Sequence, residues 1–109
     1  RMVVAKDHIY SNYSDSELSI RNVSQLVSMS HFHFLRVFKS VYGISPHQYL
    51  KGIRIERAKY LLSKSDLPIN TIALSVGFKE PTTIYPILKN LLSTTPLGYR
   101  MKLSNFEKS

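Results

Sequence analysis

The sequence has no cysteine, and only four of its 109 residues are glycine. Without cysteine the chain can form neither a disulfide nor a thiolate metal site, which suits a reducing compartment. It also lacks an apolar run of about eighteen residues and a signal-peptide pattern, so nothing predicts membrane insertion or export. We therefore expect a cytoplasmic protein with no membrane partner.

Acidic residues are scarce as well. Seven Asp and Glu stand against 15 Lys and Arg, which gives a formal net charge of +8 and a pI near 9.9. Such an excess is unfavourable for a small domain unless its partner is a polyanion, and it predicts nucleic acid. Residues 1–64 carry ten basic and four acidic residues, and residues 65–109 carry five and three, so the first part is expected to bind phosphates more strongly. The alternative is a basic protein with no such partner.

The sequence offers no catalytic or metal site. His31 and His33 are two positions apart on an expected helix and point to different sides, whereas zinc-binding pairs on a helix use spacings such as i, i+4. The carboxylates are scattered, and there is no glycine-rich phosphate loop or nucleophile elbow. We expect neither an enzyme nor a bound metal or cofactor.

The first half predicts three helices. Residues 1–13 contain four apolar residues expected to cover a core, namely Val3, Val4, Ile9 and Tyr10. Ser19 can cap a short helix with apolar residues at positions 20, 23, 26 and 27. After a break at 28–30, Ser30 can cap a longer helix from His31 to Tyr42, and Gly43 follows where a left-handed residue is favoured. A short helix, a tight turn and a longer helix are the outline of a helix-turn-helix.

The longer helix has two distinct faces. One is an apolar stripe with helical spacing, formed by Phe34, Val37, Phe38 and Val41. The other combines two apolar and two basic residues, Phe32, Leu35, Arg36 and Lys39. This mixture suits a DNA major groove, where apolar side chains contact thymine methyls and arginine binds guanine. The alternative is that Phe32 and Leu35 pack on a neighbouring helix.

The remaining helices form a second copy of the same pattern. Ser45 and Pro46 mark the start of a long helix, about 45–63, whose apolar residues are Tyr49, Leu50, Ile53, Ala58, Leu61 and Leu62. A short helix at 68–76 ends at Gly77, and a longer one runs from Pro81 toward Leu92. Thr95 and Pro96 then repeat the start signal of Ser45 and Pro46 before a last short helix.

The internal repeat can be followed residue by residue. Ile20 and Val23 match Ile69 and Ile72 at an offset of 49, and from Phe34 onward the offset is 50. Under the second offset Lys39 matches Lys89, and the run Ser-Pro-x-x-Tyr at 45–49 matches Thr-Pro-x-x-Tyr at 95–99. The second turn is therefore expected to be one residue longer than the first.

These motifs resemble the DNA-binding domain of the AraC/XylS family of bacterial transcription regulators. The match is carried by SMSHFHFLRVFKSVYGISPHQYLKGIRIERAKYLL in the first half and by INTIALSVGFKEP and TPLGYR in the second. The resemblance implies an all-α fold of about seven helices, in which two helix-turn-helix subdomains, about 1–44 and 64–103, are bridged by the helix at 45–63. Residues 104–109 would be a frayed tail. Two recognition helices would enter successive major grooves of double-stranded DNA.

The resemblance also assigns candidate DNA-binding residues. In the first unit they are His31, Phe32, Leu35, Arg36 and Lys39, and in the second they are Lys79, Thr82, Thr83, Tyr85 and Lys89. Lys6, Arg21, Arg54 and Arg57 could each contact phosphate or simply be solvated. RNA polymerase is a candidate second partner, and such regulators commonly carry an effector or dimerisation domain that would lie outside these residues.

The second unit departs from the family pattern. Pro86 stands where the family usually has an arginine equivalent to Arg36, and Ser93 stands where it has a turn glycine. Proline inside a helix removes one hydrogen bond and costs about 3 kcal/mol, so Pro86 is expected to interrupt the second recognition helix. The first helix-turn-helix should then dominate binding. A competing hypothesis is a protein-interaction domain that kept the fold and lost DNA reading.

Overall fold

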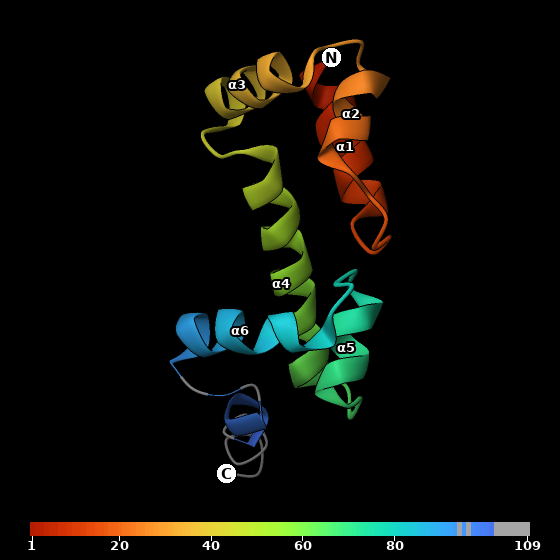
Figure 1. Ribbon diagram of the computed structural model, residues 1–109. Coiled ribbons are helices and arrows are strands. Elements are labelled where there is room, and N and C mark those ends of the chain that lie inside the picture. The colour runs from red at the N-terminus through yellow and green to blue at the C-terminus, as the bar shows by residue number, and fades with distance from the viewer. Residues whose placement is uncertain (94, 96, 102–109) are drawn as a thin grey trace. The chain divides into compact units, whose positions relative to one another are not determined.

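The computed structural model describes residues 1–93, 95 and 97–101, and within these ranges the regular structure is entirely helical. The elements are α1 (Met2–Asn12), α2 (Ile20–Leu26), α3 (His31–Tyr42), α4 (Pro46–Lys64), α5 (Ile69–Ser75), the 3₁₀ helix η1 (Pro81–Thr83) and α6 (Ile84–Leu92) (Figure 1). Residues 97–101 are also helical. The all-α prediction is confirmed, and the tail expected at 104–109 lies outside the described residues.

Two compact units divide the chain, Arg1–Ile53 and Arg54–Ser109, and the boundary falls inside α4. The first residues of α4 belong to unit 1 and its last residues to unit 2. Each unit contains one short helix followed by a turn and a longer helical segment.

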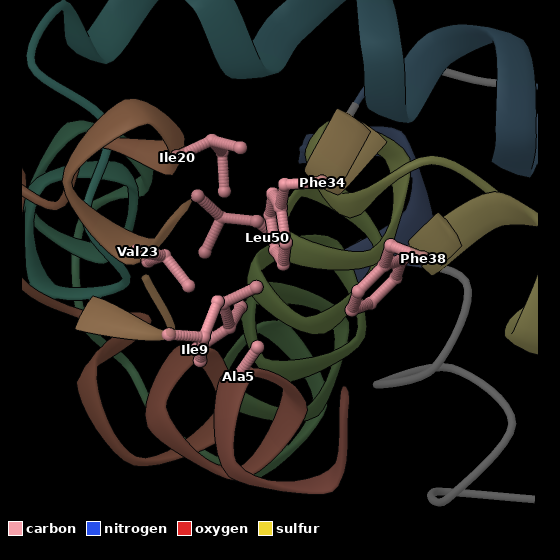
Figure 2. Close-up of a cluster of buried hydrophobic side chains, with 8 residues drawn as sticks. Ala5, Ile9, Ile20, Val23, Phe34, Phe38 and Leu50 are labelled. Atoms are coloured by element: carbon pink, nitrogen blue, oxygen red, sulfur yellow. The ribbon is translucent and has the colours of Figure 1, made fainter. Parts of the chain in front are cut away.

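The core of unit 1 gathers side chains from four helices. Figure 2 shows Ile9 of α1, Val23 of α2, Phe34 of α3 and Leu50 of α4 directed toward one another. Phe34 and Phe38 are completely buried, and their ring centroids are 5.8 Å apart. Phe38 also lies 4.8 Å from Tyr42 and 5.9 Å from Tyr49, again between centroids. This aromatic cluster fixes α3 on the core and so determines which of its faces remains outside.

Three apolar residues expected to cover the core in α1 are instead exposed. Val3, Val4 and Tyr10 have exposed fractions of 65%, 56% and 62%. Ala5 and Ile9 are buried, because their i, i+4 spacing places them on one side of the helix and the other three on the opposite side. Only Ile9 was assigned correctly from the sequence.

Smaller errors of the same kind occur in the other helices. Leu26 at the end of α2 and Val41 near the end of α3 are exposed, and Tyr42 packs against the core instead of Val41. Tyr42 lies four residues after Phe38, so it extends the buried row directly. In α4, Ile55 is buried with an exposed fraction of only 3%, although it is not among the apolar residues expected to face the core.

The apolar core described for unit 2 is built from aliphatic side chains. Its buried residues are Ile55, Ala58, Leu62, Ile72, Ala73, Val76, Ile84 and Leu88. Ile84 and Leu88 occupy the positions of Phe34 and Phe38 at the offset of 50, and all four side chains are completely buried. The second copy thus keeps the buried positions of the repeat but fills them without aromatic rings.

The two turns share one backbone motif. The N–H groups of Ser28 and Met29 donate to the carbonyls of Gln25 and Ser24, at 3.0 and 2.9 Å. At an offset of 49, Gly77 and Phe78 donate in the same way to Leu74 and Ala73, at 3.2 and 3.1 Å. This pair of bonds is a Schellman motif, which requires a left-handed residue just after the helix. Ser28 adopts it with φ 58°, and Gly77 has φ 109°.

The turn after this motif differs between the units as expected. Residues 27–30 connect α2 to α3, whereas residues 76–80 connect α5 to η1, so the second connection is one residue longer. The repeat is therefore present in the backbone hydrogen bonds as well as in the sequence.

Side-chain caps mark the starts of α3, α4 and the helix at 97–101. Ser30 accepts a hydrogen bond from the backbone N–H of His33 at 3.3 Å and so caps α3. Ser45 accepts from Gln48 N–H at 3.1 Å, and the Gln48 side chain accepts in return from Ser45 N–H at 3.0 Å, which forms a capping box. Thr95 caps the helix at 97–101 by accepting from Gly98 N–H at 3.0 Å. Pro96 lies outside the described residues.

Arg100 closes unit 2 from the far end of the sequence. Its Nε donates to the carbonyl of Leu62 at 3.1 Å, and one terminal nitrogen donates to the carbonyl of Leu67 at 2.6 Å. Carbonyls at the end of a helix have no partner within it, and a cation there also complements the helix dipole. Arg100 therefore caps the C-terminal end of α4 and is no free surface cation.

Among the helices that the structure describes, none is long and apolar enough to cross a membrane.

Candidate nucleic-acid interface

The outer face of α3 is the best-defined candidate surface in unit 1. Phe32 is 75% exposed, although it is large and apolar, and Arg36 and Lys39 are exposed as well. Phe32 and Arg36 are four residues apart and so lie on one side of the helix, about one turn from each other. Because Phe34 and Phe38 anchor the opposite side in the core, this face is held rigidly toward solvent.

Leu35 does not belong to this face. It is half-buried and packs against the core of unit 1, as the alternative interpretation had it, whereas Phe32 does not. The reason is its spacing, because Leu35 lies three residues before buried Phe38 and therefore flanks the apolar row. Leu35 thus differs from Phe32, Arg36 and Lys39, which are exposed.

His31 is half-buried at the first position of α3. Its ring meets that of Phe32 edge-on, with centroids 5.7 Å apart, and its Nδ1 is enclosed without a hydrogen-bond partner. This contact can hold the Phe32 ring in place. Among the described residues, no three potential ligand side chains gather into a metal site.

Sequence reasoning missed two polar residues on the outer face of α3. His33 and Ser40 are exposed and lie three residues before and four residues after Arg36. The spacing i, i+3, i+7 was the available signal, since it places all three on one side of the helix.

Unit 2 accommodates Pro86 without the expected break at that residue. The helical segment begins as η1, Pro81–Thr83, and becomes α-helical at Ile84, so Pro86 is the third residue of α6. The first N–H groups of an α-helix have no partner within it, and proline is tolerated in the first turn for that reason. The irregularity expected at Pro86 therefore lies earlier, at the change from 3₁₀ to α-helix. Pro86 itself is exposed.

The candidate residues of unit 2 lie around this start. Thr82 and Thr83 are exposed in η1, Lys79 is exposed in the preceding turn, and Lys89 is exposed in the last turn of α6. Tyr85 is 37% exposed, and its hydroxyl donates a hydrogen bond of 2.8 Å to Oδ1 of Asn70 in α5. No pattern in the sequence indicated that Asn70 belongs to this group.

Several cations that could contact phosphate lie over aromatic rings of their own unit. Lys6 Nζ lies 4.6 Å from the ring centroid of Tyr42, and the Arg57 guanidinium lies 4.7 Å from that of Tyr60. Arg54 lies 5.8 Å from the ring of Phe78 in the second turn. These contacts are cation–π interactions that orient the cations and attach them to the fold.

Charge is not distributed as the division at residue 64 suggested. Arg1–Ile53 contains six basic and three acidic residues, and Arg54–Ser109 contains nine and four. The net charges are thus +3 for unit 1 and +5 for unit 2, because the cations in the second half of α4 belong to unit 2. Divided at this boundary, the net charge does not favour unit 1. The difference that remains is in the recognition helices, with Arg36 and Lys39 in α3 against Lys89 in α6.

Comparison with known proteins agrees with this architecture. Residues 23–102 match the family described as "Helix-turn-helix domain". The chain is 32% identical to the melibiose operon regulatory protein of Escherichia coli K12 over 88% of its length, and 30% identical to the arabinose operon regulatory protein of the same organism over 92%. These alignments cover 31% and 34% of the two relatives, so the chain spans about a third of their length.

Solved structures give the same result. The C-terminal domain of the response regulator AraT from Geobacillus stearothermophilus superimposes with a TM-score of 0.85 at 30% identity, covering 93% of this chain and 84% of that one. The C-terminal domain of the two-component response regulator yesN from Fusobacterium nucleatum gives 0.83 at 30% identity, covering 89% and 94%. The DNA-binding domain of AdpA, solved in complex with a target DNA, has the same fold, with a TM-score of 0.84 at 24% identity. The family is one of regulators and not of enzymes. The chain belongs to the AraC/XylS family of helix-turn-helix DNA-binding domains.

Proposed function

We propose that this chain binds double-stranded DNA sequence-specifically in the major groove and thereby regulates transcription in the bacterial cytoplasm. The observation that carries the proposal is the outer face of α3, where a 75% exposed phenylalanine stands beside exposed Arg36 on a helix anchored by two buried phenylalanines. An aromatic ring in this position can make apolar contact with the methyl group of thymine. Arginine on the same side can bind guanine through two hydrogen bonds.

Within this proposal the first unit supplies most of the base recognition. Pro86 removes the cation that would correspond to Arg36, so α6 has no arginine on its exposed face. The charge of unit 2 supports a role in phosphate binding, which positions a protein on DNA without reading its sequence. Affinity should fall steeply with salt, because each neutralised phosphate releases counterions.

The test starts from selection of bound sites in random duplex DNA. With a selected duplex, fluorescence anisotropy should show that Arg36→Ala loses about 1–3 kcal/mol of preference for one base pair. Lys89→Ala should weaken all duplexes to a similar and smaller extent, as expected for a phosphate contact. The ranking of the units would be overturned if Arg36→Ala left affinity unchanged and Lys89→Ala abolished it.

A second variant tests the role of Pro86 directly. We expect selection with Pro86→Arg to yield an extended motif, because arginine restores a base-reading side chain on α6. If the wild type shows no preference for any duplex over competitor DNA and binds a protein partner independently of salt, the chain is a protein-interaction domain and the proposal is wrong. We also propose RNA polymerase as a second partner and an effector or dimerisation domain elsewhere in the whole protein.

A further inference from the structure

The second recognition helix lacks the usual cation but carries a tethered tyrosine. In α6 the exposed residues of the first turn are Tyr85 and Pro86, and proline offers neither an N–H nor a polar side chain. Tyr85 is therefore the residue with hydrogen-bonding capacity in this turn. In a helix-turn-helix, the first residues of the recognition helix contact base edges.

Asn70 determines how the Tyr85 hydroxyl can be used. The hydroxyl proton is directed to Asn70 Oδ1 at 2.8 Å, across a separation of 15 residues, so the tyrosine is fixed to the preceding helix. Figure 1 shows α5 beside the start of the α6 segment, and α5 packs directly against η1. A hydroxyl has one donor and two lone pairs, so with its proton committed it remains a hydrogen-bond acceptor.

A hydroxyl that can only accept a hydrogen bond can bind some groups of DNA and not others. Phosphate oxygens only accept hydrogen bonds, so a hydroxyl held in this way cannot bind them without releasing Asn70. The major groove presents amino donors on two bases, N6 of adenine and N4 of cytosine. We infer that Tyr85, positioned by Asn70, reads an adenine or cytosine amino group in the second half of the target site. This inference rests on the proposed function, since it assumes that α6 lies in the major groove.

The experiment compares four proteins on duplexes changed at one base pair at a time. These are the wild type, Asn70→Ala, Tyr85→Phe and the double variant, measured by anisotropy on a duplex selected with the wild type. Both single variants should lose about fivefold in preference at one and the same base pair, the loss expected for one neutral hydrogen bond. The double variant should lose no more than either single variant, because Asn70 acts through Tyr85.

Two control variants and one base analogue sharpen the result. Thr71→Ala changes an exposed neighbour of Asn70 in α5, and Tyr60→Phe removes the hydroxyl of an exposed tyrosine in α4, so both should keep the preference. If the base read is adenine, replacing it by purine, which lacks the 6-amino group, should cost the wild type about fivefold and Tyr85→Phe nothing. Thermal unfolding of each variant confirms that it is folded.

Three results would overturn the inference while leaving the proposed function intact. They are a uniform loss on all duplexes, an effect of the two variants at different base pairs, and a selected motif in which no base pair responds to Tyr85→Phe. A wild type that prefers no duplex would refute the proposed function and this inference together.

Discussion

The Schellman turns of the two repeats have different residues at the left-handed position, and exchanging these residues by mutation tests their contribution to stability. Ser28 has φ 58° and is exposed, whereas Gly77 fills the equivalent position with φ 109° and is buried. A left-handed conformation costs an ordinary residue about 1–2 kcal/mol. Glycine avoids this cost, but its larger conformational entropy in the unfolded chain lowers the free energy of unfolding by about 0.4–1 kcal/mol. We therefore expect Ser28→Gly to raise the free energy of unfolding of unit 1 by about 0.5–1 kcal/mol.

The reverse exchange should be unfavourable by a larger amount. Gly77→Ser puts a side chain at a φ well beyond the left-handed region that other residues tolerate, at a buried site, so we expect a loss of about 2 kcal/mol or more. Ser28→Ala is the matched control, since it keeps the Cβ and should change stability by less than about 0.5 kcal/mol.

Thermal and urea unfolding, followed by circular dichroism, measure these differences. A gain of about 1 kcal/mol corresponds to a rise in Tm of about 4–8 °C for a domain of this size. Because the two residues lie in different units, any separate transitions would assign each shift to its own unit. If Ser28→Gly leaves Tm unchanged or lowers it, backbone strain at Ser28 is not what the turn geometry indicates.

Three further predictions concern two aromatic residues of unit 1 and the Arg100 cap of unit 2. Phe38→Ala should destabilise unit 1 by about 3–5 kcal/mol, measured by urea unfolding, because it removes a completely buried ring, and the exposed Phe32→Ala should have little effect. Burial is the main cause that raises the pKa of Tyr49, and the neighbouring Tyr10, Asp7 and Tyr42 raise it further. Because the folded state then holds the Tyr49 proton more tightly than the unfolded state, the free energy of unfolding should fall as pH rises above about 10. Tyr49→Phe should lose less free energy of unfolding than the wild type over the same pH range in urea unfolding. Arg100→Ala should lower the Tm of unit 2 by several degrees through loss of two hydrogen bonds to carbonyls, and Arg100→Lys should restore only part of it.

The sequence predicts well those structural features that depend on residues close together in the chain. The bounds of α3, the cap at Ser30 and the left-handed residue at Gly43 all follow from residues within one or two turns of each other. The long helix was expected at 45–63 and is observed at Pro46–Lys64. These features depend on hydrogen bonds between neighbours in the chain, which is why residue type and spacing reveal them.

Features that depend on distant residues were not predictable in the same way. Their apolar side chains predict that Val3, Val4 and Tyr10 face the core, yet the packing of α2 and α3 against α1 buries the side with Ala5 and Ile9. Similarly, Asn70 and Tyr85 are 15 residues apart, and Arg100 and Leu62 are 38 apart. No periodicity in a single sequence connects such pairs.

The effect expected of Pro86 was wrong because the α-helix starts later than the sequence indicates. The rule that proline is unfavourable inside a helix assumed that the helix began at Pro81. The first residues are 3₁₀-helical, so the α-helix begins at Ile84 and Pro86 falls within its first turn. The loss of the arginine side chain, which concerns DNA reading, is independent of this correction.

The contacts of Arg100 have a consequence for synthesis of the chain. Domains fold during translation once their sequence has emerged, the N-terminal part first. Every buried core residue of unit 1 lies before residue 54, so that unit can fold before the last residues of unit 2 have emerged from the ribosome. Unit 2 must wait for Arg100 before the end of α4 is capped, 38 residues after Leu62 was made. The nascent chain would thus present a finished first reader next to an unfinished second one.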